Sequence, residues 1–260
     1  MKMRNALILG LLVFFPVLQV HGGSFTVDGT DAIYLAGRTD ITIPPLGTNP
    51  STFLARHGFV AADFLLETFP DFKIVTAGDV LNFLATGCVN YFNGIGCSGP
   101  GTGFGPDGGD PNGSILNSFG GISSYSGPEG GLVGLFLDNN IPNGVAPSGL
   151  DFTGGGLGMD FLELSPGLGQ VFFIGDGQTS GNVVQAFMAP EGATRLFLGI
   201  PDGFSFDDKP GAYEDNDGFF LVAAPEFSGM LYGIPNFGWI FSLGGGLVGL
   251  VGIRRKQSRA

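Results

Sequence analysis

The segment Ala193-Thr-Arg-Leu-Phe-Leu-Gly-Ile200 shows the pattern that decides the fold of this chain. It is a short apolar run with turn residues on both sides, which is typical of a β-strand. In an extended chain, Leu196 and Leu198 share one face, while Arg195 and Phe197 share the other. Four more segments have the same form: Asp79 to Gly87, Gly131 to Asp138, Gly169 to Gly175 and Gly218 to Ala224.

No long stretch between these runs shows helical periodicity. Many short strands joined by glycine-rich turns are typical of packed antiparallel sheets, so we predict an all-β, jelly-roll-like β-sandwich in the middle of the chain. Residues 24–60 form an N-terminal extension, in which Phe25 to Asp31 and Ile33 to Arg38 are candidates for an extra pair of strands. Gly94 to Pro128, rich in Gly, Ser, Pro, Asn and Asp, is expected to be a long surface connection. Such a connection is either an ordered, functional loop or an ordinary flexible one.

The N-terminus carries a charged start followed by an apolar run. Lys2 and Arg4 precede the uncharged segment Ala6 to Leu18, and small residues follow it. This order is typical of a secretory signal peptide, and the run is shorter than the roughly 20 residues that a membrane-spanning helix needs. We predict a signal peptide over residues 1–23; the alternative is a buried helix at the edge of a domain.

The C-terminus differs in kind, because Phe227 to Ile253 contains no charged residue. Residues 235–253 would form a helix about 28 Å long, which is roughly one hydrocarbon thickness. The basic residues Arg254, Arg255 and Lys256 follow directly. By the positive-inside rule this tail stays cytoplasmic, so we predict a membrane-spanning helix with the middle of the chain outside.

Charge is distributed unevenly along the chain. Of its 11 Lys and Arg residues, six lie in the two terminal segments, whereas all 23 Asp and Glu residues lie between them. An acidic region of this kind repels nucleic acid and anionic lipid. A cation is therefore the expected partner, and nucleic acid is not.

The chain has two cysteines, Cys88 and Cys97. On the oxidising side of a membrane they are expected to form a disulfide that closes a small loop. The alternative is two free thiols. A thiolate metal site is not expected, because no CxxC motif or nearby histidine completes one.

An acidic loop from Ile200 to Phe220 joins two predicted strands. It offers carboxylates, an asparagine amide and backbone carbonyls, which are the oxygen ligands that calcium takes. Its spacing differs from that of the helix-flanked calcium loop. Composition alone therefore leaves two readings of this loop, a calcium site or a solvated acidic surface.

Two motifs follow one another along the middle of the chain. The first is Ala85-Thr-Gly-Cys-Val-Asn-Tyr91 with Gly105-Pro-Asp-Gly108, and the second is Ala193-Thr-Arg-Leu-Phe-Leu-Gly-Ile-Pro-Asp202, followed by Pro210-Gly-Ala-Tyr-Glu-Asp-Asn-Asp-Gly218-Phe-Phe. In this order they resemble an earlier motif and the closing strands of the PA-I galactophilic lectins, a family of calcium-dependent β-sandwich sugar binders. The resemblance covers roughly residues 60–224.

This resemblance implies a Ca²⁺ site and a set of ligands for it. The side chains would be those of Asp202, Asp215 and Asn216, which would also contact a sugar, and the backbone carbonyls would be those of Tyr91 and Ala212. Relative to the family, residues 203–209 are an insertion, so Asp207 or Asp208 is an alternative to Asp202. Ala212 stands where the family has Thr, and the family's sugar-binding His and Gln have no counterpart here. The resemblance therefore implies calcium binding more strongly than a preference for galactose.

The end of the chain resembles the PEP-CTERM sorting signal of exopolysaccharide-producing Gram-negative bacteria. The residues that carry this likeness are Pro225, Glu226, Arg254 and Arg255, with the apolar helix between them. The resemblance implies processing by an exosortase, a transient single-pass membrane stage, and a final location at the cell surface or in the extracellular matrix. A plain C-terminal anchor is the alternative.

These observations favour an exported protein with a calcium-binding β-sandwich that binds carbohydrate or exopolysaccharide. A second class is a structural matrix or biofilm protein, in which calcium only stabilises the fold. An enzyme is not expected, because the sequence has neither a GxSxG nor an HExxH motif. Paired acidic residues of the kind used in glycoside hydrolysis stay open at this stage, because Asp and Glu are plentiful.

Overall fold

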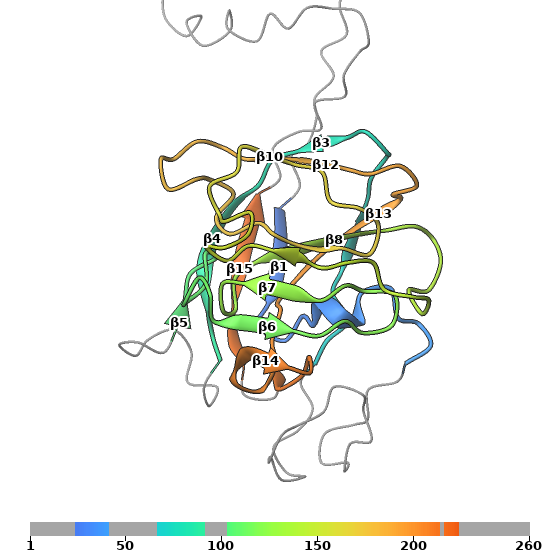
Figure 1. Ribbon diagram of the computed structural model, residues 1–260, viewed down its shortest axis with the longest axis horizontal. Helices are drawn as coiled ribbons and strands as arrows, with labels where there is room; N and C mark the ends of the chain where they lie inside the picture. Colours follow the sequence, from blue (N-terminus) through green and yellow to red (C-terminus); the bar gives the residue numbers. More distant parts are fainter. Residues whose placement is uncertain (1–23, 42–66, 92–102, 214–215, 224–260) are drawn as a thin grey trace, which may run out of the picture. The chain divides into compact units, whose positions relative to one another are not determined.

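Strand β13, Arg195–Gly199, occupies the segment quoted first and lies inside a four-stranded antiparallel sheet. The computed structural model describes residues 24–41, 67–91, 103–213 and 216–223 (Figure 1). The order of this sheet is β11-β8-β13-β2, where β11 is Val171–Phe173, β8 is Val133–Leu137 and β2 is Phe72–Ile74. Leu196, Phe197 and Leu198 are each 2% exposed, so both faces of β13 are covered.

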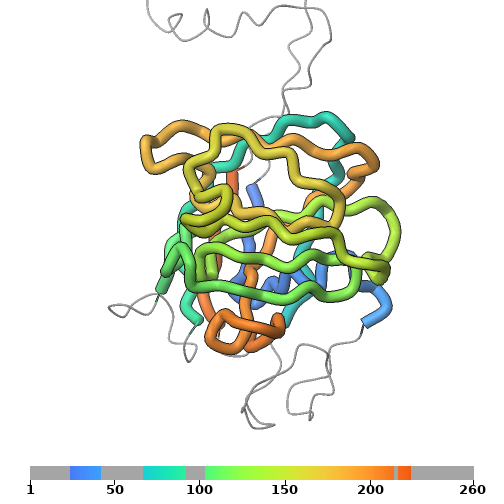
Figure 2. Tube along the Cα trace, viewed as in Figure 1, coloured from blue at the N-terminus to red at the C-terminus, as the bar shows by residue number. Residues whose placement is uncertain are grey.

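A second antiparallel sheet joins the beginning of the described chain to its end. Its order is β1-β15-β4-β5, with β1 Ser24–Asp28, β15 Asp217–Ala223, β4 Leu84–Asn90 and β5 Gly103–Phe104. Figure 2 shows the blue first strand beside the orange-red last one. Seven residue pairs join β15 to β4. Because Phe220 and Val222 are buried while Phe219 and Leu221 are about half exposed, only one face of this sheet meets the core.

Two smaller sheets complete the fold and contain some parallel pairs. One has the order β14-β6-β7-β9, formed by Asp207–Asp208, Ser114–Leu116, Tyr125–Gly127 and Leu150–Asp151. The other has the order β10-β12-β3, formed by Glu163–Leu164, Ala186–Met188 and Val80–Leu81. The pairs β14–β6, β7–β9 and β10–β12 are parallel. The described chain is thus all-β with several antiparallel sheets, which is consistent with a β-sandwich.

The core is rich in phenylalanine. The rings of Phe136 and Phe172 stack with centroids 5.1 Å apart, and Phe172 contacts Phe187 at 5.5 Å. Phe187 also packs on Phe83 at 5.4 Å, so aromatic contacts link β8, β11 and β12 with the turn before β4. Aromatic pairs of this kind contribute about 0.5–1.5 kcal/mol beyond the area they bury.

Two local predictions are wrong. The stretch predicted as a long connection contains β5, β6 and β7 within its described part, because Ser114, Leu116 and Tyr125 point into the core between glycines. The expected strand over Ile33 to Arg38 is instead a 3-10 turn, η1, at Ile33–Leu35, and its three residues are buried. A further 3-10 turn, η3, lies at Phe204–Phe206.

Several predicted features lie outside the described residues. They are the signal peptide (1–23), the membrane-spanning helix (235–253), and the sorting residues Pro225, Glu226, Arg254 and Arg255. Within the part of the chain that the structure describes, no helix is both long and apolar enough to cross a membrane.

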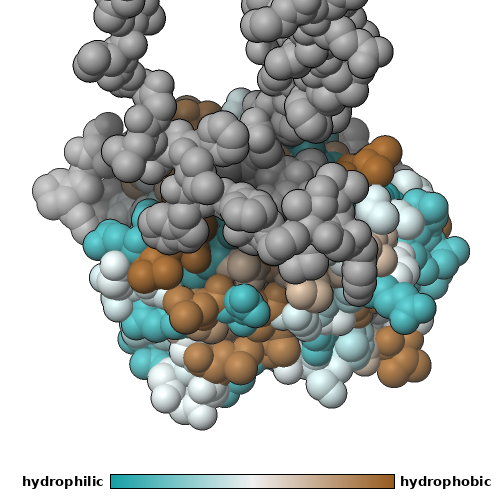
Figure 3. Space-filling model, turned by 90° about the horizontal axis from the view of Figure 1, so that it is seen from above, coloured by the Kyte–Doolittle hydropathy of each residue, from teal (hydrophilic) through white to brown (hydrophobic). Residues whose placement is uncertain are grey.

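Apolar side chains also reach the surface of the described unit. Figure 3 shows them in brown, interrupting a hydrophilic surface. Four of the larger ones lie on strands, namely Phe72 and Ile74 on β2 and Phe219 and Leu221 on β15. Strand β2 is at the edge of its sheet, so its exposed side chains have no neighbouring strand on one side.

Candidate functional site

Asp202, just after β13, is an almost completely buried carboxylate with 3% exposure. Its Oδ1 accepts a hydrogen bond from the Gly203 amide at 2.7 Å. Its own amide donates to the Tyr213 hydroxyl at 3.2 Å, and its carbonyl accepts from the Gly211 amide at 3.0 Å. Burying a charge is costly unless polar groups or cations compensate it. The hydrogen bond from the Gly203 amide therefore stabilises the buried carboxylate of Asp202.

Asn216, just before β15, lies against Asp202. Its Nδ2 donates to Asp202 Oδ2 at 2.8 Å and to the carbonyl of Gly29 at 2.8 Å. Both partners are acceptors, so the amide orientation is fixed and Oδ1 is directed elsewhere. That oxygen is buried and has no hydrogen-bond partner among the described residues. Leaving a buried acceptor unsatisfied costs about 1–3 kcal/mol, which makes this atom a candidate ligand for a cation.

Tyr91 reaches the same place through the register of the sheet. Asn90 pairs with Asp217, and continuing the register by one residue puts Tyr91 opposite Asn216. Burial raises the pKa of the Tyr91 hydroxyl well above its usual value, and the negative charge of Asp202 raises it further. The hydroxyl itself donates to the Gly130 carbonyl. Its side chain is thus occupied, and only its backbone carbonyl is relevant to the predicted site.

Ala212 lies in the loop between Asp202 and Asn216 and is 7% exposed. Its φ of +66° is in the left-handed region, where an L-residue with a side chain is strained by roughly 1–2 kcal/mol. Ser205, Phe206 and Asp208 in the same loop also have positive φ. Such strain persists only where surrounding contacts hold it, and it clusters at functional sites.

The two alternative acidic residues lie apart from the Asp202–Asn216 pair. Asp207 and Asp208 form β14, are exposed, and pair with β6. Asp208 accepts a hydrogen bond from the Asn117 side chain, and Asp207 accepts one from the Asp208 amide. The structure therefore brings Asp202, rather than either of these two, next to Asn216.

The remaining predicted ligand, Asp215, lies outside the described residues. Among the residues that are described, no group of three or more His, Cys, Asp or Glu side chains is placed to hold a metal. The described part of the predicted site thus consists of one carboxylate, one amide and two backbone carbonyls.

Cys88 lies on β4 opposite Phe219 and is disulfide-bonded. The other cysteine of the sequence, Cys97, lies outside the described residues. Cys88 is three residues before Tyr91, so its covalent bond restrains the end of β4 that leads to the candidate site.

One feature that sequence reasoning missed is a pocket of about 490 Å³ beside β2. Arg38 and Arg195 line it together with exposed aromatic residues. The feature of the sequence that could have indicated this pocket is the presence of these two arginines, because few basic residues lie in the acidic middle of the chain. Their convergence depends on the pairing of β2 with β13, which a local pattern does not reveal.

The comparisons with known proteins do not assign this chain to a family. No family model matches this chain, and no curated protein matches it either. Its function is therefore argued from the residues of the site, which is where the function of a protein resides.

Proposed function

We propose that this chain is an exported cell-surface or matrix protein whose β-sandwich holds Ca²⁺ at the Asp202–Asn216 pair and binds extracellular carbohydrate. The observation that carries the proposal is the Asn216 Oδ1 atom, which is buried without a partner beside a buried carboxylate. Calcium takes carboxylate, amide and carbonyl oxygens. A divalent cation would give this oxygen a partner. For Asp202 to bind the same ion, the Asn216 amide, whose Nδ2 donates to Asp202 Oδ2, would turn so that its oxygen faces the carboxylate.

The residues present fit such an ion. Asp202 and Asn216 would contribute side-chain oxygens, and Tyr91 and Ala212 would contribute carbonyls, with Asp215 as a further carboxylate. Bound there, Ca²⁺ would supply a positive charge that links the ends of β4, β13 and β15. We also infer that the sandwich is jelly-roll-like, because the two motifs that resemble the lectin family end on these same strands.

Carbohydrate binding follows from the same resemblance. The proposed set supplies five oxygens if each residue gives one, whereas calcium takes about six to eight. Hydroxyl oxygens of a sugar are suitable for the open positions. In this reading Asp202, Asp215 and Asn216 contact both the ion and the sugar.

A second function has an observation in its favour. Asp202 and Asn216 are only 3% and 4% exposed, which gives a sugar little access to their side chains. A structural matrix protein, in which calcium only stabilises the fold, needs no such access. A glycan array probed with and without calcium separates the two functions, because only the lectin-like protein retains sugars in a calcium-dependent way.

Export and sorting belong to the same proposal. The signal peptide, the apolar helix and the Pro225-Glu226 motif support delivery to the cell surface and processing by an exosortase. The mass of the mature protein tests this directly. Loss of both terminal segments is expected, whereas a retained C-terminal helix would show a plain membrane anchor.

The calcium site is tested by thermal unfolding of the full chain with calcium and with a chelator. Ligand at about 100 times its Kd stabilises a fold by about 2.7 kcal/mol, so the melting temperature should rise with calcium. Asp202→Asn should abolish this rise, whereas Asp208→Asn, which changes an exposed acid of the same loop, should keep it. A calcium-independent melting temperature in the unmodified chain would sink the proposal.

A further inference from the structure

The pocket beside β2 is built from residues that the candidate calcium site does not use. Its lining includes Arg38, Phe69, Asp71, Phe72, Arg195 and Phe197. Its volume of about 490 Å³ is within the range of small-molecule sites, which is about 300–1,000 Å³. Neither Asp202 nor Asn216 is part of this lining.

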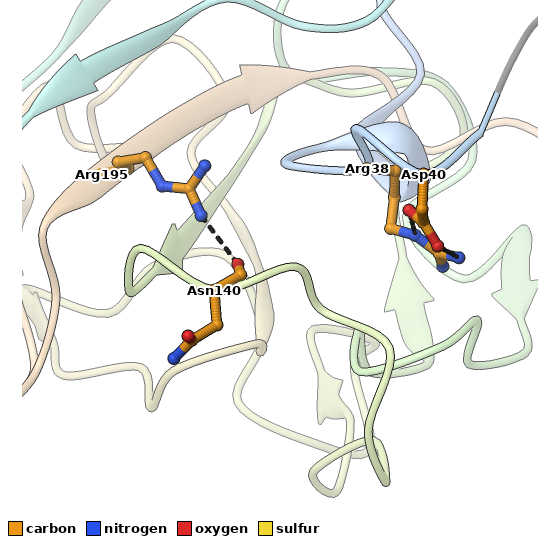
Figure 4. A network of polar contacts seen from close by, with 4 residues as sticks. All are labelled: Arg38, Asp40, Asn140 and Arg195. Atoms are coloured by element: carbon orange, nitrogen blue, oxygen red, sulfur yellow. Dashed lines mark hydrogen bonds and ion pairs between the residues drawn. The ribbon is translucent and has the colours of Figure 1, made fainter.

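Arg195 presents an unneutralised positive charge at the pocket wall. Its Nε donates to the Asp138 carbonyl at 2.8 Å, and its Nη2 donates to the Asn140 carbonyl at 2.9 Å (Figure 4). Its guanidinium carbon lies 5.7 Å from the Phe72 ring centroid and 5.2 Å from that of Phe197. All these partners are neutral, and no carboxylate of the described residues forms an ion pair with Arg195.

The second arginine of the pocket, Arg38, differs from Arg195 because a carboxylate neutralises its charge. Arg38 forms a bidentate ion pair with Asp40, and both contacts measure 2.9 Å (Figure 4). Its guanidinium carbon also lies 4.9 Å from the centroid of Phe119. The Arg38–Asp40 pair is therefore a closed part of the wall, and Arg195 is the group suited to an anion. The Nε and Nη2 of Arg195 donate to the Asp138 and Asn140 carbonyls, so Nη1 is the nitrogen that is left to donate a charge-assisted hydrogen bond to a carboxylate.

The cation of β2, Lys73, does not belong to the pocket. It pairs with Leu196 of β13, so it lies on the opposite face of the sheet from Phe72, Arg195 and Phe197, and its Nζ is 4.0 Å from the Phe25 ring centroid. Arg195 is therefore the cation that favours an anion in this pocket of a chain whose net charge is −12.

The rest of the lining narrows the class of anion. Phe69 and Phe72 are 43% and 51% exposed, so they offer apolar ring surface to a ligand. Asp71 lines the same pocket; it repels a purely anionic ligand but accepts hydrogen bonds from hydroxyl groups. The ligand should therefore combine a carboxylate, hydroxyl donors and an apolar face, which are the features of a sugar acid.

We propose that this pocket binds a uronic acid residue of an anionic polysaccharide. Arg195 receives the carboxylate, Asp71 accepts hydrogen bonds from hydroxyl groups, and the rings of Phe69 and Phe72 cover the apolar face of the sugar. The proposal extends the carbohydrate binding proposed above to a second site, and it requires no calcium.

The test is a calorimetric titration of the full chain with tetragalacturonate in the presence of a chelator. We expect binding that Phe72→Ala and Arg195→Gln each weaken by about tenfold or more, the loss of one good contact. Ile74→Ala is the matched control, because Ile74 is 76% exposed on the same strand but does not line the pocket. It should bind like the unmodified chain.

Methyl-esterified tetragalacturonate keeps the sugar rings and removes the charge, so it should bind at least about tenfold more weakly than the free acid. Equal binding of the ester, unchanged binding by Phe72→Ala, or no binding of the acid would each overturn the proposal. Binding that appears only when calcium replaces the chelator would assign the uronate to the calcium site instead. A missing calcium effect on melting, by contrast, would affect only the calcium proposal.

Discussion

Two buried tyrosines show how the contribution of a hydroxyl group to stability depends on its hydrogen-bond partners. The Tyr213 hydroxyl donates to the Ile200 carbonyl at 2.7 Å and accepts from the Asp202 amide at 3.2 Å. The Tyr34 hydroxyl is fully buried and has no partner among the described residues. An unsatisfied buried group reduces stability, whereas a bonded one contributes to it.

We therefore predict opposite effects for two identical substitutions. Tyr213→Phe should lower the free energy of unfolding by about 1–3 kcal/mol, because it leaves the Asp202 amide and the Ile200 carbonyl without the hydroxyl. Tyr34→Phe should leave that free energy unchanged or raise it. Urea unfolding measures both, and an equal loss in the two variants would contradict the assignment.

Asp31 gives a prediction about pH. Burial raises the pKa of this carboxyl above its ordinary value of 3.8, while hydrogen bonds from the Thr68 hydroxyl and the Asp28 amide lower it. Because the folded-state pKa is the higher one, Asp31 destabilises the fold at neutral pH. This cost disappears as the pH falls through the folded-state pKa.

Thr68→Val should therefore raise the pKa of Asp31 further and destabilise the fold by about 1 kcal/mol at neutral pH. The loss should shrink as the pH falls toward 3.8 and Asp31 takes up its proton. Thr30→Val is the control, because its hydroxyl contacts that of Thr68 and not the carboxylate. NMR titration of the Asp31 carboxyl follows the pKa, and a loss of stability independent of pH would refute this interpretation.

At the level of single residues, local sequence indicates the chemistry of the candidate site but not the contacts that join it to distant parts of the chain. Asp202 and Asn216 belong to one acidic loop, so the sequence could group them. The bond from Asn216 to the Gly29 carbonyl spans 187 positions, and no local pattern signals it. The same limit hid the pocket, because Arg38 and Arg195 are far apart in the chain.

At the level of elements, strands with continuous apolar runs were predictable and strands between glycines were not. β8, β11 and β13 fall within predicted segments, and β15 begins one residue before its predicted segment, at Asp217. The predicted strand over Asp79 to Gly87 divides into β3 and β4, because Phe83 turns into the core between them. β6 and β7 have only three residues each. Two inward side chains in β6 and one, Tyr125, in β7 give no detectable period.

Turn glycines provide a matched test at this scale. Gly177 and Gly78 have nearly the same positive φ, 87° and 88°. A Cβ at Gly177 would collide with the carbonyl of Phe83, whereas a Cβ at Gly78 would meet nothing within 4 Å. Their alanine variants therefore separate backbone strain from steric exclusion.

Gly78→Ala should cost about 1–2 kcal/mol, which is the strain of the left-handed region alone. Gly177→Ala should cost more, because the turn before the Gln178–Val184 bridge must also move away from Phe83. Chemical denaturation of both variants measures the difference. Equal losses of unfolding free energy in the two variants would show that the backbone around Phe83 shifts at no cost to accommodate the new Cβ.

At the scale of the whole molecule, the first strand of the described chain closes the sheet that carries its last strand. β1 pairs with β15, and Asn216 at the start of β15 bonds to Gly29 just after β1. The candidate ion site thus lies where early and late parts of the chain meet. A cation there would tie both parts together and would offset the acidity of a protein with 23 acidic and 11 basic residues.

The most direct test of this account is a calorimetric titration of calcium into the chelator-treated full chain. We predict one calcium ion per chain, and no binding to an Asp202→Asn variant whose circular dichroism shows that it is folded. Absence of binding to the unmodified chain, or the same stoichiometry in the variant, would contradict the claim that Asp202 and Asn216 hold the ion.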